Sequence, residues 1–117
     1  MASKYGNRYV KADGYTFDSQ AEYGRYCQLV LAVNAKVISG LQVHPRYELQ
    51  PAFVDNQGQR VKPIVYEADF AYYENGVMII EDIKGVETEA FKLKWKLLRY
   101  KFVGQRTIEC RIVNVKS

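Results

Sequence analysis

The chain has 117 residues, of which 48% are hydrophobic and 26% charged, values that are typical of a globular protein and exclude wholesale disorder. This length predicts a single domain over residues 1–117. The formal net charge of +4 and the pI near 9.0 favour a polyanionic partner, nucleic acid first. The longest apolar runs are far too short to cross a bilayer, so we expect no membrane function.

The few histidines and cysteines limit the chemistry. His44 is the only histidine, so neither a zinc site built on several histidines nor a histidine-based triad has enough residues. We expect His44, beside Pro45, to be a strand-end residue without a chemical role. Cys27 and Cys110 form no C-x-x-C motif, and the N-terminus has no signal-peptide pattern, so we expect buried, reduced thiols in a cytoplasmic protein.

The N-terminal third predicts an arm and a helix. Residues 1–14 are polar and end in Asp-Gly, which favours a flexible arm or a short strand. A helix is predicted over residues 18–34, because Ser19-Gln-Ala-Glu22 fits a capping box and apolar residues recur on one face.

The next segment, residues 41–55, is strand-like but interrupted by prolines. Pro45 and Pro51 predict an edge strand or a bent strand, since proline cannot donate to a central ladder. Residues 55–58, Asp-Asn-Gln-Gly, predict a turn.

The strongest hairpin signal lies at residues 63–73 and 77–84, two strand-like runs joined by Asn75-Gly76. A helix is predicted over 88–102 from apolar residues at helical spacing, followed by a last strand over 107–115. The order α-β-β-β-α-β predicts an α/β fold with a central mixed sheet flanked by helices. Because the second helix crosses between two strands, we expect the last strand to pair in parallel.

Acids meet on one face of this hairpin if Asn-Gly forms a two-residue type I′ turn. Counting from the turn then places Asp69 opposite Asp82 and Glu67 opposite Lys84. Strand alternation puts Asp82 and Lys84 on one face and Glu81 on the other. Directly opposed carboxylates destabilise a sheet unless a cation lies between them. Mg²⁺ suits this position, because it commonly binds through one or two carboxylates plus substrate phosphates.

Two alternatives stay open at this point. The acids and Lys84 could form solvated cross-strand ion pairs, although Met78 and Ile80 on the same face indicate burial. A longer turn would shift the register by one residue and exchange Asp82 with Glu81. No residue nearby in the sequence explains an acid at Glu81.

Four stretches carry a resemblance to a known family: GYTFDSQAE (14–22), LQVHPRYELQPAF (41–53), YEADFAYY (66–73) and IIEDIKG (79–85). In this order they resemble the PD-(D/E)XK nuclease superfamily. More narrowly, they resemble its small phage-encoded, Holliday-junction-resolvase-like endonucleases. The resemblance implies a restriction-endonuclease-like fold, a role in phage recombination or replication, and a bacterial host cell as the location. Ala68 stands where the motif name has proline.

The family's motif residues carry over individually. Asp69 and Asp82 match the two metal-binding acids, and Lys84 matches the lysine that places or activates the attacking water. Glu22 matches an acid on the first helix that completes the metal site in many members, although it could simply close the capping box. The Ile83 carbonyl is a candidate further ligand. The implied cofactor is Mg²⁺, with Mn²⁺ as a substitute, and no small-molecule cofactor is expected.

The expected function is that of a metal-dependent endodeoxyribonuclease, selective for branched or duplex DNA. A homodimer is expected because junction resolution needs two active sites. The helix over 88–102 leaves cations outside its apolar face, which are either an ordinary solvated surface or contacts for DNA phosphates: Lys92, Lys94, Lys96 and Arg99. Secondary candidates lie in the arm: Lys4, Arg8 and Lys11. The alternatives are a non-catalytic DNA-binding module with a nuclease-like fold, a nicking, transposase-associated or RNA-directed nuclease, and a protein-interaction domain.

Overall fold

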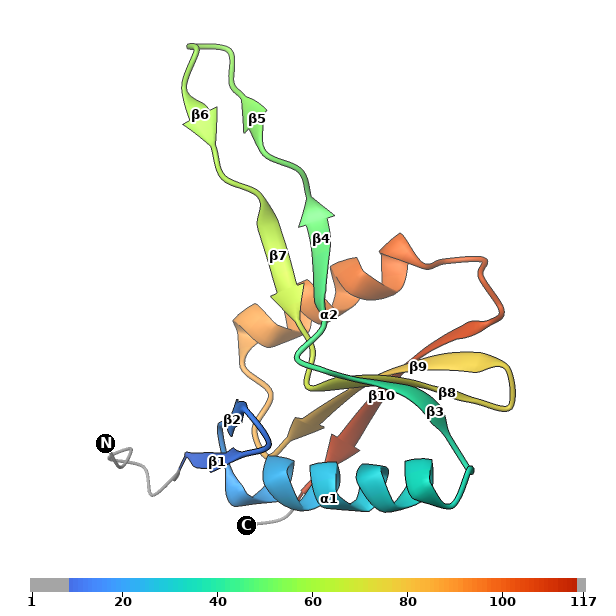
Figure 1. Cartoon of the computed structure of the whole chain (residues 1–117). Coiled ribbons are helices and arrows are strands. Elements are labelled where there is room, and N and C mark those ends of the chain that lie inside the picture. Colours follow the sequence, from blue (N-terminus) through green and yellow to red (C-terminus); the bar gives the residue numbers. More distant parts are fainter. Residues whose placement is uncertain (1–8, 116–117) are drawn as a thin grey trace.

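The computed structural model describes residues 9–115, and its centre is a mixed four-stranded sheet in the order β10-β9-β8-β3 (Figure 1). Helix α1 (Gln20–Asn34) covers one face of this sheet and α2 (Glu89–Lys101) covers the other. The strands have the following bounds: β3 Ser39–Val43, β8 Phe70–Glu74, β9 Val77–Lys84 and β10 Ile108–Asn114. The predicted α/β class with a mixed sheet is confirmed.

The helices and the strands of this sheet follow one another in the order expected from the sequence. Strand β10 pairs in parallel with β9, as the crossover through α2 predicts, with Ile108 opposite Met78. Helix α1 begins two residues later than predicted, after Ser19, whose hydroxyl accepts a hydrogen bond from the Glu22 amide at 3.1 Å. Helix α2 is capped in the same way by Thr88.

The turn between β8 and β9 has the predicted geometry. Asn75 and Gly76 both have positive φ values, 53° and 80°, as a type I′ turn requires. Glu74 therefore lies opposite Val77 and Phe70 lies opposite Glu81, so the register counted from the sequence is confirmed. Asp82 stays on the α2 face and Glu81 on the α1 face.

The prediction of one strand over residues 63–73 is wrong, because the chain bends at Ala68-Asp69. It forms β7 (Ile64–Glu67) before the bend and β8 after it. The bend is held from a neighbouring turn, since the His44 amide donates to the Asp69 carbonyl at 2.9 Å and the Ala68 amide donates to the Pro45 carbonyl at 3.0 Å. Glu67 consequently lies opposite Arg46 on β4, 3.3 Å from its guanidinium, and not opposite Lys84.

The segment between the two bends projects from the body as a two-stranded ribbon (Figure 1). Its inner half pairs β4 (Arg46–Gln50) with β7, and its outer half pairs β5 (Phe53–Val54) with β6 (Arg60–Val61). The predicted turn at residues 55–58 forms its tip. The strand expected over 41–55 is thus divided into β3, β4 and β5, and the bend at Pro45 is where the chain leaves the sheet.

A short hairpin precedes α1. Strand β1 (Val10–Ala12) pairs with β2 (Tyr15–Phe17) around Asp13-Gly14, so part of the predicted arm is a strand. Lys11 is exposed on β1, whereas the candidates Lys4 and Arg8 lie outside the described residues.

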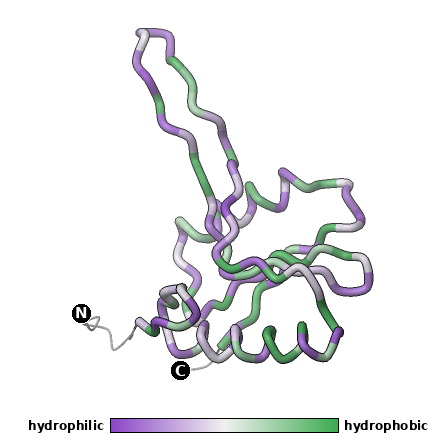
Figure 2. The backbone as a smooth tube through the Cα atoms, viewed as in Figure 1, coloured by the Kyte–Doolittle hydropathy of each residue, from purple (hydrophilic) through white to green (hydrophobic). Residues whose placement is uncertain are grey.

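Apolar side chains pack on both faces of the sheet, where the tube in Figure 2 is coloured as hydrophobic. On the α1 face, Phe17 and Leu29 pack against Tyr72 and Ile79. On the α2 face, a separate cluster forms around Trp95 and Leu98. The two cysteines are free thiols, as expected, but both are only half-buried. Between residues 9 and 115 no helix is both long and apolar enough to span a membrane.

Glu81, the acid that the sequence left without a partner, is fully buried against α1 in an ion pair. The guanidinium of Arg25 donates to its carboxylate at 2.7 and 2.9 Å, and the Tyr72 hydroxyl donates at 2.6 Å. Arg25 comes from α1, so this ion pair joins the helix to the centre of the sheet. Its charge is matched, and Glu81 needs no bound cation.

Replacing Arg25 with alanine should destabilise the fold by about 3 kcal/mol, because it leaves the Glu81 carboxylate buried without a counter-charge. Arg46→Ala is the matched control, since it removes an exposed ion pair and should cost less than about 1 kcal/mol. Urea unfolding of both variants measures the difference. Equal, small losses would show that the Glu81 ion pair contributes little.

Candidate functional site

Asp69 and Asp82 meet where β8 begins and β9 approaches its end. Asp82 is only 1% exposed, and Asp69 lies in the bend just before β8. The Asp69 amide donates to Asp82 Oδ1 at 2.9 Å, and the Ile83 amide donates to Asp69 Oδ2 at 2.8 Å. Each carboxylate therefore accepts a backbone hydrogen bond beside the other acid. The two acids are adjacent, as the register predicts, although the ladder ends at Phe70–Glu81 and Asp69 lies just beyond it.

Glu22 reaches this pair from the first turn of α1. Its side chain is buried, and its carboxylate lies near enough to Asp69 to raise the pKa of that acid. Its Oε1 also accepts from the Asp18 amide at 2.8 Å, just before the helix. The two interpretations of Glu22, helix cap and third acid, are therefore compatible.

Burial raises the pKa of both aspartates. For Asp69 burial and the neighbouring Glu22 raise the pKa to about 8, and the backbone hydrogen bond from Ile83 and the Lys84 ammonium offset only part of this effect. Burial likewise raises the pKa of Asp82 to about 6, against the opposing effect of Lys84. Burial therefore disfavours the charged form of each aspartate.

Lys84 supplies a positive charge from the last position of β9. Its Nζ lies over the Phe91 ring at 4.4 Å from the centroid, a cation–π contact with the first turns of α2. The ammonium lowers the pKa of both aspartates, so it acts on the predicted pair. Helix α2 thus fixes the lysine next to the acids.

His44 is the residue that sequence reasoning missed. Its Nε2 lies 3.6 Å from Glu22 Oε1, and its amide holds the bend at Asp69. It also has a positive φ of 57°, a strained conformation that tends to occur at functional sites. The only signal in the sequence was its place before Pro45 at a strand end, which predicts a bend but no neighbour.

The chemistry of the donor set fits a cation completed by substrate. Among residues 9–115, no three acid, histidine or cysteine side chains are arranged to enclose a metal ion by themselves. However, Asp82 Oδ2 is buried without a hydrogen-bond partner in the described chain. An orphaned carboxylate oxygen beside a second acid suits Mg²⁺, which keeps several waters and binds substrate phosphates.

Residues 2–117 match a family model described as protein of unknown function, DUF1064. The chain belongs to the DUF1064 family. No curated protein and no solved structure matches it. The family description carries no activity, so the function has to be inferred from the site itself.

The cations predicted to contact DNA in this DUF1064 chain are all exposed on α2: Lys92, Lys94, Lys96 and Arg99. The opposite side of the helix is buried and carries Phe91 and Trp95. Lys94 Nζ lies 3.5 Å from the Val65 carbonyl on β7, so the helix and the base of the ribbon form adjoining surfaces. Lys84, which acts on both acids, contacts Phe91 in the first turn of α2, so this helix lies next to the acid pair.

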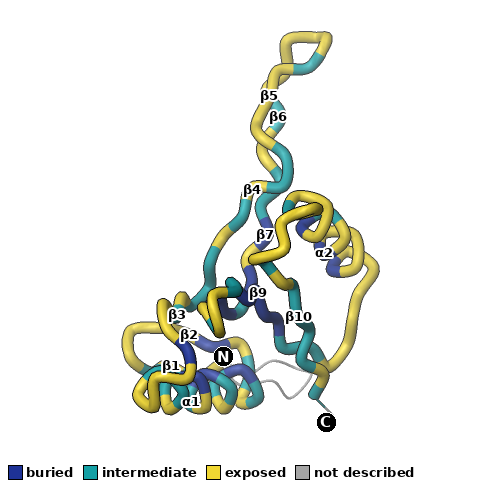
Figure 3. Tube along the Cα trace, turned by 90° about the vertical axis from the view of Figure 1, so that its right-hand side faces the viewer, coloured by how far each residue is buried: buried dark blue, intermediate teal, exposed yellow. Residues whose placement is uncertain are grey.

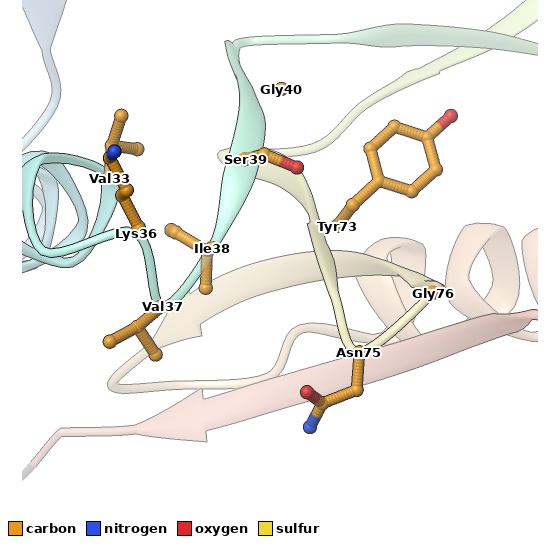
Figure 4. Close-up of a pocket in the computed structure, with 9 residues that line it drawn as sticks. All are labelled: Val33, Lys36, Val37, Ile38, Ser39, Gly40, Tyr73, Asn75 and Gly76. Carbon is orange, nitrogen blue, oxygen red and sulfur yellow. The ribbon is translucent and has the colours of Figure 1, made fainter.

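A hollow of about 430 Å³ lies at the other end of the sheet, beside the Asn75-Gly76 turn (Figure 4). Its lining includes Tyr73 and Val33 and one charged residue, Lys36. No acid lines it, so the hollow and the acid pair are separate features of the DUF1064 chain.

The metal-free protein should lose stability as the pH rises from about 5 to 8. An unfolded aspartate has a pKa of about 3.9, so the folded state binds more protons across this range and the free energy of unfolding falls as these protons leave. One pKa unit corresponds to about 1.4 kcal/mol, so the loss should be on the order of a few kcal/mol. Thermal unfolding in EDTA at each pH measures it. The Asp69→Asn, Asp82→Asn double variant should show a much flatter pH profile, and a profile as steep as wild type would contradict the assignment to these acids.

Proposed function

We propose that the chain is a Mg²⁺-dependent endodeoxyribonuclease that acts on branched DNA, in the manner of a Holliday-junction resolvase. The observation that carries this proposal is the buried opposition of Asp69 and Asp82, with one carboxylate oxygen left unpaired. A purely structural acid in this sheet obtains a matched partner, as Glu81 does from Arg25. Asp82 is equally buried but has no guanidinium partner. A bound cation is the simplest source of a positive counter-charge for it.

The fold supports the same class of enzyme. Two helices on opposite faces of a mixed sheet, with Asp69 just before β8, Asp82 on the neighbouring β9 and a lysine two residues further, are compatible with a restriction-endonuclease-like core. The ribbon is then an insertion between the first two strands of that core. Fold alone does not imply activity, so the proposal depends on the acids and the lysine.

Each residue has a role that its position allows. Asp69 and Asp82 would hold the ion, and the Ile83 carbonyl is a further candidate ligand beside them. When bound, Mg²⁺ supplies an acidified water and polarises the scissile phosphate. Lys84 orients the attacking water and offsets the negative charge that develops on the phosphate. Glu22 positions Asp69, and His44 adjoins Glu22 from the other side.

The substrate is proposed from charge. Helix α2 contacts Lys84 of the site through Phe91, and its exposed cations can contact DNA phosphates, which positions a duplex without reading its sequence. Such contacts suit an enzyme that selects the shape of its substrate. Cleavage of a four-way junction on both strands requires two active sites, so the proposed enzyme is a homodimer.

Asp82→Asn and Lys84→Ala should each reduce Mg²⁺-dependent cleavage of a labelled four-way junction by at least about 100-fold, because the first removes a carboxylate that would hold the ion and the second removes the cation that offsets the phosphate charge. Both variants should remain folded, since Asp82→Asn removes a buried like charge from the acid pair. Glu67→Gln, an exposed acid at the same end of the molecule, is the matched control and should keep full activity.

The same assay separates the alternatives when it compares junction, duplex, flap and single-stranded DNA and RNA in Mg²⁺, Mn²⁺ and EDTA. Paired symmetric nicks on the junction support a dimeric resolvase. Full activity of Asp82→Asn or Lys84→Ala would overturn the site assignment. Binding without cleavage in either metal would favour a non-catalytic module, and preferred nicking of duplex would favour a nicking enzyme.

Replacing both Lys92 and Lys96 with glutamine should weaken DNA binding. It should also lower the slope of log K against log[salt], the salt slope, by the amount expected for the loss of about two phosphate contacts. Fluorescence anisotropy over a range of KCl concentrations measures both quantities. The control variant Lys36→Gln, Arg106→Gln removes two exposed cations at the turn end of the sheet and should change neither. An unchanged salt slope in the α2 variant would exclude this helix from the DNA contact.

A further inference from the structure

The outer half of the ribbon, residues 51–63, has no role in the fold described so far. Strands β5 and β6 pair with each other and with no other strand in the described chain. Figure 3 shows this half as mostly exposed, whereas the inner half packs on α2 through Tyr47 and Leu49. An isolated two-stranded ribbon is only marginally stable in water, so its retention needs a reason outside the core.

The tip of the ribbon is a turn held by hydrogen bonds to Asp55. Asp55 Oδ1 accepts hydrogen bonds from the amides of Gln57 and Gln59, both at 2.9 Å, and the Asp55 amide donates to the Gln59 carbonyl at 2.8 Å. Gly58 has a φ of 79°, which the turn requires. The only carboxylate of the outer half is therefore used within the turn, and its two cations, Arg60 and Lys62, determine the charge presented to a partner.

The two faces of the outer ribbon differ. Val54 lies opposite Arg60, and strand alternation places Lys62 on the same face as Arg60. The other face carries the pair Phe53 and Val61, with Phe53 46% exposed. One face thus offers two adjacent cations and the other an exposed aromatic ring.

The edges of the ribbon are poorly suited to another strand. The pairs Gln50–Ile64 and Phe53–Val61 place Pro51 opposite Pro63 between them. Both strands consequently lack an amide donor at the same level, which opposes the addition of a strand from a second copy. The two cations on one face would also repel the same face of a second copy.

The root of the ribbon is part of the acid site. The chain leaves the sheet at His44-Pro45 and returns at Ala68-Asp69, and two backbone hydrogen bonds join these bends. The ribbon therefore starts at the corner of the fold that holds Asp69, and its outer half lies beyond β4 and β7. The basic helix α2 packs against the same root, so ribbon and helix can contact one extended polyanion.

We propose that the outer ribbon is a nucleic-acid-binding arm that recognises the branch of a DNA substrate. Arg60 and Lys62 contact phosphates, and Phe53 stacks on a base exposed at the branch point. A two-stranded ribbon fits the major groove of B-DNA, and aromatic stacking on unpaired bases tolerates any sequence. The arm deepens the proposed function, because it supplies the preference for branched over plain duplex DNA, and its choice of partner class rests on that function.

The test is DNA binding in EDTA, measured by fluorescence anisotropy so that no cleavage is needed. Arg60→Glu with Lys62→Glu should weaken binding to a four-way junction by at least about tenfold and lower the salt slope by about two contacts. Phe53→Ala should weaken binding to the junction about tenfold but binding to plain duplex much less, since stacking on a base exposed at the branch point is lost. Lys36→Glu with Arg106→Glu is the control of equal net charge and should bind nearly as wild type.

A second variant removes the arm. Residues 53–61 are replaced by Asn-Gly, which closes the ribbon below the tip and leaves the packed inner half in place. Loss of junction preference in this variant supports the arm. Unchanged affinity and salt slope in all ribbon variants would overturn it, as would a wild-type dimer that becomes monomeric on shortening while DNA binding per monomer is unaltered, because the ribbon would then be a dimerisation arm.

Failure of the arm and failure of the nuclease give different results. Ribbon-dependent DNA binding without cleavage in Mg²⁺ or Mn²⁺ would leave the arm in place and overturn the enzyme. Junction cleavage that is insensitive to the ribbon variants would do the reverse. Absence of DNA binding by the wild-type chain would overturn the arm.

Discussion

The bend at Ala68-Asp69 is the constraint on which the rest of the molecule depends. At this point the regular ladder between β8 and β9 ends, and carboxylates take the place of backbone carbonyls: Asp82 accepts from the Asp69 amide and Asp69 accepts from the Ile83 amide. The same oxygens that end the sheet are therefore the ones available for chemistry. Because the acids complete the backbone hydrogen bonding, they are retained although their burial is costly.

Glu81 and Asp82 are consecutive buried acids on β9, but they differ in the partners that compensate their charge. Glu81 is 0% exposed and Asp82 is 1% exposed, but only Glu81 receives a guanidinium and a phenol hydroxyl as partners. The charge of Glu81 on the α1 face is thus compensated by Arg25. This ion pair stabilises the fold because it joins the helix to the sheet. Asp82, on the α2 face, keeps an unpaired oxygen, and beside it burial and Glu22 raise the pKa of Asp69 to about 8. Such a contrast between neighbouring acids is typical of a functional site set into a structural sheet.

The local signals in the sequence predicted the parts of the fold that depend on local chemistry. Asn75-Gly76 determines a type I′ turn, which in turn determines the register and the opposition of Asp69 and Asp82. The caps and apolar spacing located both helices. The ribbon was missed because strand-like residues run continuously through Ala68-Asp69, and the bend is imposed by hydrogen bonds from His44 and Pro45, distant in the sequence.

Two side-chain contacts were not predicted, because they too join residues that are distant in the sequence. Arg25 and Glu81 are separated by 56 residues, and nothing in either neighbourhood of the sequence indicates their contact. His44 was assigned to a strand end, which is correct as structure, but only the packing of α1 on the sheet brings it to Glu22. Residues whose neighbours come from tertiary packing are those that a single sequence leaves undetermined.

The ribbon and the acid site both depend on the same two bends in the chain. The bends that release the ribbon from the sheet also place Asp69 outside the ladder, where its side chain can turn toward Asp82 and Glu22. Without the bend, β7 would run straight into β8, and Asp69 would then be an ordinary ladder residue with its amide paired to a strand. The insertion therefore does more than extend the surface. The bends at its root create the irregular corner in which the two acids are adjacent, and for that reason the proposed arm and the proposed site are physically coupled in this fold.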